Sequence, residues 1–281
     1  MAGSSPRPTS EVPPLPVTVI GGYLGAGKTT LVNHLLRHPE GRRLAVLVNE
    51  FGDLPIDADL IERRDEDMIA IAGGCVCCSY GSDLIEALER LLTLDPRPDH
   101  LLIEASGVAL PGGIASSLTL LMGYRLDAVL VLADAETIRA RAADRYLGDT
   151  IARQLADADL VLLNKADLVS SDYLAETGEW LAGASPRARI VTATNAAPPA
   201  DLVLGIATER LPAYEHAHHH HSAGYDTASF PVTAPADAEA LARALADPAL
   251  ELLRAKGFVP VADGRLRTIQ TVAQRWSVSA A

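Results

Sequence analysis

The first residues that could do chemistry form a glycine-rich run, Gly22-Tyr-Leu-Gly-Ala-Gly27-Lys28-Thr29. The run fits the pattern GxxxxGK[ST], and it stands between a short apolar stretch and an expected helix, as that pattern requires. Its glycines let backbone N–H groups turn toward phosphate oxygens, and the helix start adds a positive end. Lys28 is expected to reach the β- and γ-phosphates, and the Thr29 hydroxyl to bind Mg²⁺. The run predicts a nucleotide phosphate site; the alternative is a chance glycine-rich turn.

A second candidate follows an apolar stretch in Leu101-Leu-Ile-Glu104-Ala-Ser-Gly107. A carboxylate at the end of a buried strand can hold Mg²⁺ through water. The N–H of Gly107 can bond the γ-phosphate, so this loop would sense the state of the nucleotide. With Lys28 and Thr29, we expect Glu104 and Gly107 to form the catalytic set.

The segment Asn164-Lys165-Ala-Asp167 fits the pattern NKxD. An Asp at this place accepts two hydrogen bonds from guanine that adenine does not offer, and the Lys stem lies along the purine. The alternative is an ordinary strand-to-helix turn capped by Asp167. Beside a phosphate loop, the segment favours a guanine nucleotide. The expected nucleotide-binding residues are Gly22, Gly25, Ala26, Gly27, Lys28, Thr29, Thr30, Asn164, Lys165 and Asp167.

The chain's three cysteines, Cys75, Cys77 and Cys78, lie within four positions of one another. A long-range disulfide framework is therefore excluded, and the cluster points to metal or redox chemistry. Thiolates suit Zn²⁺ or another thiophilic divalent ion. A closed structural zinc site has four protein ligands, so one position stays open to an acid, a His, water or a recipient protein. The alternative is that these cysteines are small buried hydrophobic residues.

The elements that must position these residues follow from apolar periodicity. Short apolar runs alternate with helical stretches, which favours right-handed βαβ units and a mainly parallel sheet flanked by helices. The expected helices are Thr30–Leu36 and Ser82–Leu94, and a long polar loop is expected at Asn49–Asp67. The expected strands are Val17–Ile20, Leu44–Val48, His100–Ile103, Ala128–Leu132, Leu160–Leu163 and Arg189–Val191.

Composition changes at Leu211–Gly224, which holds five of the eight histidines. We interpret this stretch as an exposed linker whose imidazoles, His218, His219 and His220 among them, bind metal as accessory ligands or are simply solvated. A small α+β domain is expected after it, with a strand at Thr227–Val232, a helix at Ala236–Lys256 and strands at Phe258–Val261 and Arg265–Ile269. The expected organisation is a tail at 1–15, an α/β domain at 16–211, a linker at 212–224 and the small domain at 225–281.

Overall composition narrows the classes of function. Hydrophobic residues make up 48% and charged residues 21% of the 281 residues, which is enough for a packed core. A net charge of −12 without a basic patch argues against nucleic acid as a partner. No run reaches the roughly 20 apolar residues of a membrane span. The Pro/Ser/Thr-rich start lacks an apolar signal core, so a cytoplasmic location without membrane partners is expected.

In combination and in order, these motifs resemble the CobW-like metallochaperone GTPases, relatives of the urease and hydrogenase nickel-insertion GTPases. Two further segments match that family, Asn49-Glu50-Phe-Gly52 and Leu253-Arg-Ala-Lys-Gly-Phe258. The resemblance covers roughly residues 16–270. It implies a P-loop fold, GTP hydrolysis with Mg²⁺, and a Zn²⁺ or Co²⁺ site at the cysteines.

The chain also departs from the family pattern at several places. Val48 stands where many members have an acidic residue, and Leu110 replaces an Asp that often follows the Glu-x-x-Gly loop. The small domain is expected to be truncated, ending soon after Trp276 without the usual last strand and helix. Glu50 and Asp53 are candidate oxygen ligands for the transferred metal or for Mg²⁺.

Two hypotheses of different kinds follow. In the first, the chain is a slow GTPase that delivers its metal to a recipient metalloprotein, with a nucleotide-dependent homodimer left open. In the second, it is a metal store or sensor whose GTP site is only regulatory.

Overall fold

The computed structural model describes residues 13–49, 68–73, 88–205, 228, 230–232 and 234–280. The described residues form a seven-stranded parallel sheet and a separate three-stranded antiparallel sheet. The large sheet has the order β3-β2-β4-β1-β5-β6-β7. Its strands are β1 (Leu15–Gly21), β2 (Leu44–Asn49), β3 (Met68–Gly73), β4 (His100–Glu104), β5 (Tyr124–Asp134), β6 (Leu160–Asn164) and β7 (Arg189–Thr192).

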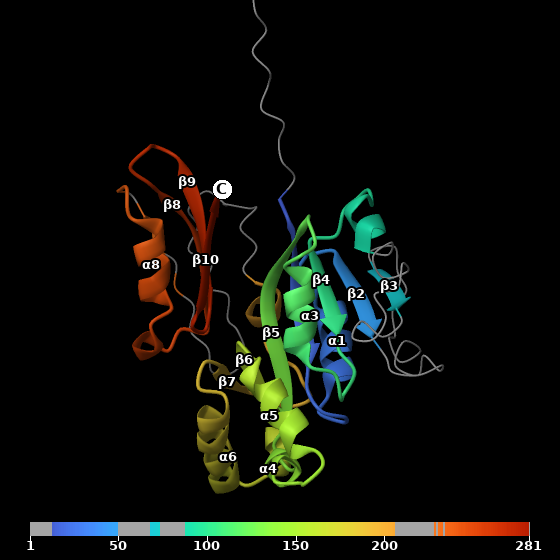
Figure 1. The fold of residues 1–281 in the computed structure, drawn as a ribbon. Helices are drawn as coiled ribbons and strands as arrows, with labels where there is room; N and C mark the ends of the chain where they lie inside the picture. Colours follow the sequence, from blue (N-terminus) through green and yellow to red (C-terminus); the bar gives the residue numbers. More distant parts are fainter. Residues whose placement is uncertain are drawn as a thin grey trace, which may run out of the picture.

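Helices cover both faces of this sheet (Figure 1). The helices are α1 (Lys28–Arg37), α3 (Pro111–Leu118), α4 (Ile138–Ala142), α5 (Gly148–Ala156), α6 (Ser171–Ala184) and α7 (Ala200–Leu204), with a further turn of helix at 88–92. Alternate residues of each central strand point to opposite faces. Thus Val17 and Val19 pack with α3 and α5 on one face, whereas Ile20 packs with α1 and α7 on the other.

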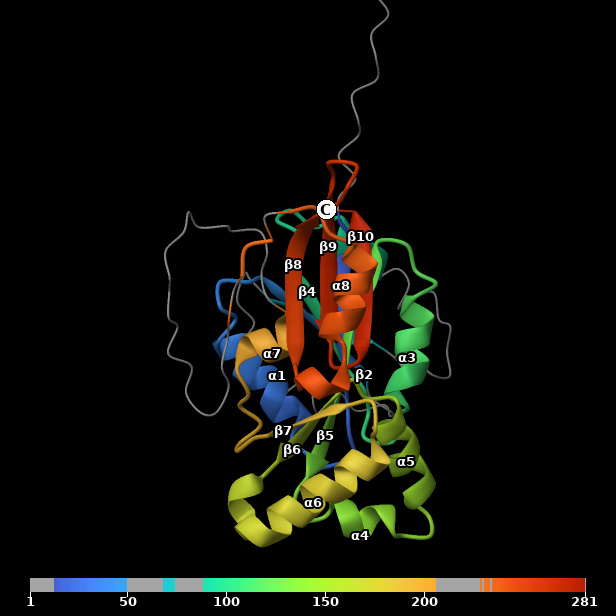
Figure 2. The same cartoon turned by 90° about the vertical axis from the view of Figure 1, so that its left-hand side faces the viewer.

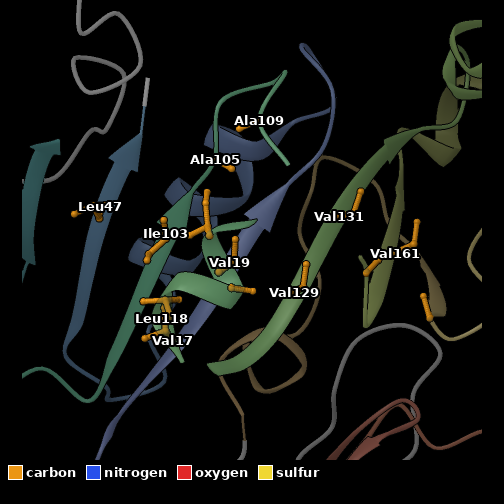
Figure 3. Close-up of a cluster of buried hydrophobic side chains, with 14 of the residues drawn as sticks. Val17, Val19, Leu47, Ile103, Ala105, Ala109, Leu118, Val129, Val131 and Val161 are labelled. Atoms are coloured by element: carbon orange, nitrogen blue, oxygen red, sulfur yellow. The ribbon is translucent and has the colours of Figure 1, made fainter. Parts of the chain in front are cut away.

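The first of these two cores is shown in Figure 3. It is built almost wholly from Val, Leu, Ile and Ala, with side chains at 0–9% exposure. Strands buried on both faces of a parallel sheet are expected to have this composition, because no face is left for polar residues. The expected strands of the large sheet are all present, and the fold class predicted from the alternating pattern is confirmed.

The small sheet contains β8 (Arg254–Pro260), β9 (Leu266–Val272) and β10 (Arg275–Ala280), and α8 (Ala238–Leu245) packs on it (Figure 2). Val259 and Ile269 meet Ala238 and Ala242 of the helix in a small core of their own. The turn between β8 and β9 is closed by Asp263, whose carboxylate accepts from the N–H of Arg265 at 2.9 Å.

Several expectations about this part were wrong. The helix expected at Ala236–Lys256 ends at Leu245, because Pro248 cannot donate to a helix and the residues from Arg254 onward pair with β9 instead. Of the strand expected at 227–232, the described residues 228 and 230–232 are not in a strand; Pro231 lacks the N–H that a ladder needs. The strand β10 runs on past Trp276, where none was expected.

A buried polar cluster joins the small sheet to the large one. Asp127 of β5 is 3% exposed, and it accepts hydrogen bonds from Arg254 of β8 and Gln270 of β9. Arg275 of β10 forms an ion pair with Asp159 at 2.8 Å. The arginines hold the pKa of Asp127 well below its usual range in spite of its burial. Because a buried charge is costly without its partner, this cluster fixes how the two sheets dock.

His100 lies beside this cluster at the start of β4 and is 1% exposed. The Thr18 hydroxyl donates to the carbonyl of Val203 at 3.0 Å, so the His100 Nε2–H must donate to Thr18 Oγ1 at 2.9 Å. Either the neutral Nε2–H tautomer or the imidazolium can make this bond, and it is burial that favours the neutral form. Burial lowers the pKa of His100 to about 3, and the neighbouring Asp127 opposes that shift only in part.

This low pKa predicts a loss of stability in mild acid. Unfolded His takes up a proton below about pH 6.5 whereas folded His100 does not, so the unfolding free energy falls as the pH drops from 7 toward 3. Between pH 7 and 5 the His100 contribution should fall by about 2 kcal/mol. Urea unfolding at both pH values should show that wild type loses this much more than His100→Gln, which keeps a donor near the Nε2 position. Equal losses of unfolding free energy in the two proteins would contradict a neutral, buried His100.

Candidate nucleotide site

The glycine-rich run forms the loop between β1 and α1, at the carboxyl edge of the large sheet. Gly22, Gly25 and Gly27 have φ of 127°, 77° and 108°, which L side chains rarely adopt. A Cβ on Gly22 would also lie 2.4 Å from the carbonyl oxygen of Leu132. These glycines are therefore required by backbone conformation and, at Gly22, by close packing on β5.

The backbone carbonyls of this loop are held from several sides. Lys28 Nζ donates to the carbonyl of Gly22 at 3.0 Å, and the N–H of Ala26 to that of Tyr23 at 3.2 Å. Asn164 Nδ2 donates to the carbonyl of Ala26 at 2.9 Å. The N–H of Leu31 bonds the carbonyl of Gly27 at 2.9 Å. With its carbonyls engaged, the loop has the backbone form in which N–H groups are available to an anion.

Thr29 and Glu104, which are both predicted to hold Mg²⁺, lie in contact. The Thr29 hydroxyl donates to Glu104 Oε1 at 3.0 Å, and Glu104 is 3% exposed at the end of β4. Because β1 and β4 run parallel with Ile20 opposite Glu104, the phosphate loop and the acidic residue leave the sheet at the same edge. Two adjacent hard oxygen donors are the ligand set that Mg²⁺ prefers, so these residues fit that ion.

Gly107 lies against the phosphate loop, where a Cβ at this position would be 2.8 Å from the N of Leu24. Gln154 of α5, which is 2% exposed, bonds the loop that contains Gly107. Its Nε2 donates to the carbonyls of Gly107 at 3.1 Å and Ala109 at 2.8 Å. Sequence reasoning missed Gln154, since a polar residue in an amphipathic helix gives no sign that it is buried.

The NKxD segment begins at Asn164, the last residue of β6, and β6 lies two strands from β1 in the sheet. Asn164 links two loops: Nδ2 contacts Ala26 and Oδ1 accepts from the N–H of Ala196 at 2.7 Å. Lys165 Nζ pairs with Asp134 Oδ2 at 2.6 Å, and Asp134 is 4% exposed at the end of β5. Asp167 lies exposed in a short 3₁₀ turn, η2 (Ala166–Leu168).

Asp134 was also missed by sequence reasoning. Its pairing fixes the Lys165 ammonium and so restrains the lysine stem, the part of the side chain expected to lie along a purine. The only signal in the sequence is an acidic residue directly after a buried strand, and many strands end in this way. Of the two residues that depart from the family pattern, Val48 is 5% exposed and lies in β2 opposite Glu104, one residue before the strand ends, whereas Leu110 precedes α3.

The remaining predicted site residues lie outside the described residues. These are the cysteines Cys75, Cys77 and Cys78, the acids Glu50 and Asp53, and the histidines His218, His219 and His220. In the part of the chain that the structure describes, no three His, Cys, Asp or Glu side chains gather as a metal-ligand set. Within the same residues, no helix is long and apolar enough to cross a bilayer.

The central strand, the glycine-rich loop after it, the acidic strand end and the NKxD segment together define a P-loop GTPase. The sequence model of the CobW/HypB/UreG nucleotide-binding domain matches residues 16–192. The chain belongs to this family.

Curated relatives and a solved structure agree with this placement. A zinc chaperone CobW from Sinorhizobium is 32% identical over 93% of this chain and 86% of its own length. The zinc chaperone YjiA from Escherichia coli is 37% identical over 69% of this chain and 60% of its own length. The crystal structure of a Zn(II)-bound triple mutant of the YjiA GTPase aligns with a TM-score of 0.50 and 25% identity, covering 96% of this chain and 90% of that one.

The base-reading residues give the first prediction for this site. If Asp167 accepts from guanine, Asp167→Asn should weaken GTP binding by about 100-fold or more and improve binding of xanthosine triphosphate, whose base presents an acceptor in place of the amine. Displacement of a fluorescent GDP analogue measures both affinities. ATP competing as well as GTP against wild type would refute the guanine assignment.

The phosphate loop gives the second prediction for this site. Lys28→Ala should lower GTP turnover by about 100-fold or more, because it removes a cation from the developing phosphate charge. Thr29→Ala should lose both turnover and its dependence on Mg²⁺ concentration. Phosphate release should be compared with Thr93→Ala, the same substitution at an exposed threonine whose hydroxyl bonds the carbonyl of Arg90. Turnover in either loop variant equal to this control would remove the assignment.

Proposed function

We propose that this chain is a GTP-hydrolysing metallochaperone that binds Zn²⁺ or Co²⁺ at Cys75, Cys77 and Cys78 and passes the ion to a recipient protein. The observation that carries the proposal is the contact of the Thr29 hydroxyl with the Glu104 carboxylate at the edge of a phosphate loop. Two relatives of this chain are named zinc chaperones, and the solved YjiA structure holds Zn(II). These names support zinc as the first ion to test.

The roles of the nucleotide-site residues follow from their chemistry. Lys28 neutralises the β- and γ-phosphates. Thr29 and Glu104 would hold Mg²⁺, which would supply positive charge to the phosphate oxygens. The N–H of Gly107 bonds the γ-phosphate, so the loop from Glu104 to Pro111 changes position when that phosphate leaves. Asn164 and Asp167 select guanine. Turnover is expected to be slow.

The strand register supports coupling between the nucleotide and the metal. Two loops are expected to respond to the γ-phosphate, a first switch loop at Asn49–Asp59 and a second at Glu104–Pro111. Asn49 pairs with Gly73, two residues before Cys75. The neighbouring Val48 pairs with Glu104 of the second switch loop. The switch loops and the cysteine segment therefore leave three adjacent strands at the same edge of the sheet. The described strand end that leads into the cysteine segment is therefore adjacent to the strand end that leads into the first switch loop.

In this mechanism GTP orders the two switch loops and lowers the entropy cost of gathering Cys75, Cys77 and Cys78 around the ion. Glu50 or Asp53 completes the ligand set with a carboxylate oxygen. Hydrolysis loosens the segment, and a recipient with a stronger site takes the metal. A coupling of about 1–3 kcal/mol, or about 5–150-fold in affinity, is sufficient for this gate.

Thermodynamic linkage gives a prediction about GTP itself. Because coupling is reciprocal, saturating Zn²⁺ should tighten binding of a non-hydrolysable GTP analogue by about 5–150-fold, the same factor by which the analogue tightens Zn²⁺. Cys77→Ser and Cys78→Ser should abolish this effect and keep basal nucleotide affinity. The neighbouring Ser79→Ala is the matched control and should keep the effect.

The His-rich stretch provides an internal comparison. Deletion of His216–His221 should lower the number of Zn²⁺ ions bound but leave the linkage intact, because these imidazoles are accessory ligands. If the nucleotide affinity of the wild type does not change when Zn²⁺ is added, the store or sensor hypothesis is favoured over the chaperone hypothesis.

A further inference from the structure

An arginine that is not part of any nucleotide motif contacts the phosphate loop. Arg141 belongs to α4, the short helix after β5. Its Nη1 donates to the carbonyl of Leu24 at 2.7 Å, and its guanidinium carbon lies 5.1 Å from the centre of the Tyr23 ring. Tyr23 and Leu24 are consecutive residues of the glycine-rich run, so a single cation contacts two successive residues of the loop.

This hydrogen bond fixes the orientation of one peptide group. The Leu24–Gly25 peptide is trans and planar, so its C=O and N–H point in opposite directions. With the carbonyl bonded to Arg141, the N–H of Gly25 points away from the arginine. The left-handed φ of 77° at Gly25 allows the sharp turn that follows. A cation on the carbonyl also polarises the peptide and makes this N–H a stronger donor.

We propose that Arg141 is a positioning residue for GTP hydrolysis, which acts by holding the Leu24–Gly25 peptide so that the N–H of Gly25 faces the phosphates. The inference rests on the proposed GTPase activity. In the loose transition state of phosphoryl transfer, negative charge builds on phosphate oxygens and the leaving group. A donor held in place before the reaction stabilises that charge more than it stabilises the bound substrate. Arg141 acts through the peptide and does not touch the nucleotide.

The position of Leu24 strengthens this assignment. Gly107 of the second switch loop packs against Leu24, with room only for a glycine. Leu24 is thus contacted by Arg141 through its carbonyl and by Gly107 near its N atom. A shift of Leu24 after loss of the arginine would displace the N–H of Gly25 and the neighbouring Gly107 together. Both are donors expected to serve the transferring phosphoryl group.

The helix α4 offers a matched control in Arg139. This residue makes the same kinds of contact away from the phosphate loop: Nη1 donates to Glu176 Oε2 at 3.0 Å, and the guanidinium carbon lies 5.3 Å from the Tyr173 ring. Arg141→Ala, Arg141→Lys and Arg139→Ala should be compared in steady-state GTP hydrolysis. The measured quantities are kcat, KM and the midpoint of thermal unfolding.

Arg141→Ala should lower kcat about tenfold and change KM less than about threefold, because the lost stabilisation belongs to the transition state. Arg141→Lys should recover part of kcat, since it keeps a cationic donor but loses the planar guanidinium that lies over the Tyr23 ring. Arg139→Ala should match wild type in both constants. The midpoint of unfolding should be similar for the two alanine variants.

A kcat for Arg141→Ala within twofold of that for Arg139→Ala would overturn the inference. So would an equal loss in both variants, which would indicate a general effect on α4. A wild-type protein that neither binds nor hydrolyses GTP would instead refute the proposed function. The wild-type arm of the same assay separates these failures.

Discussion

The phosphate loop depends on hydrogen bonds that fix its backbone carbonyls in place. The donors are Lys28 at Gly22, Arg141 at Leu24 and Asn164 at Ala26, and they come from three separate parts of the chain. A loop of this kind cannot keep its shape on glycine alone, because glycine gives conformational freedom rather than order. The fold supplies the order by bringing distant donors to one place.

Parallel pairing of the strands brings the residues of the site to one edge of the large sheet. In β1, Ile20 lies opposite Glu104 and Gly21 opposite Val131; in β5, Asp134 lies opposite Asn164. Every strand that carries a site residue therefore ends at the same edge. Ligands of open α/β sheets bind at this edge, where loops from adjacent strands meet. The same register places the backbone just before the cysteine segment next to the switch loops, which is the physical basis for coupling a metal to a nucleotide.

Most strands of the large sheet and the motifs of the nucleotide site could be predicted from the sequence. Buried parallel strands are continuous apolar runs, and the nucleotide motifs have fixed spacing. The strand β3 (Met68–Gly73) was missed: it lies at the edge of the sheet, and its methionine, alanines and glycine favour a strand less than the Val, Leu and Ile of the central strands do. The predicted helix at Ala236–Lys256 was too long. Its Ala, Leu and Arg residues favour a helix, but from Arg254 onward the pairing of β8 with β9 overrides that preference.

The supporting residues of the site were beyond sequence reasoning. Arg141, Gln154 and Asp134 lie in ordinary helical or strand-end positions, and only the tertiary structure shows that they bond the phosphate loop, the Gly107 loop and Lys165. The polar cluster around Asp127 was missed for the same reason, since its partners come from residues more than 100 positions away. Short-range patterns find the residues that meet the ligand, but not those that position them.

The most direct test of this account is a competition titration of Zn²⁺ into the purified protein, saturated in parallel with GDP or with a non-hydrolysable GTP analogue, both with Mg²⁺. If the γ-phosphate gathers the cysteine ligands, the dissociation constant for Zn²⁺ should be about 5–150-fold lower in the GTP-analogue state. Equal dissociation constants in the two states would contradict it, and the protein would be a GTPase with a passive metal site.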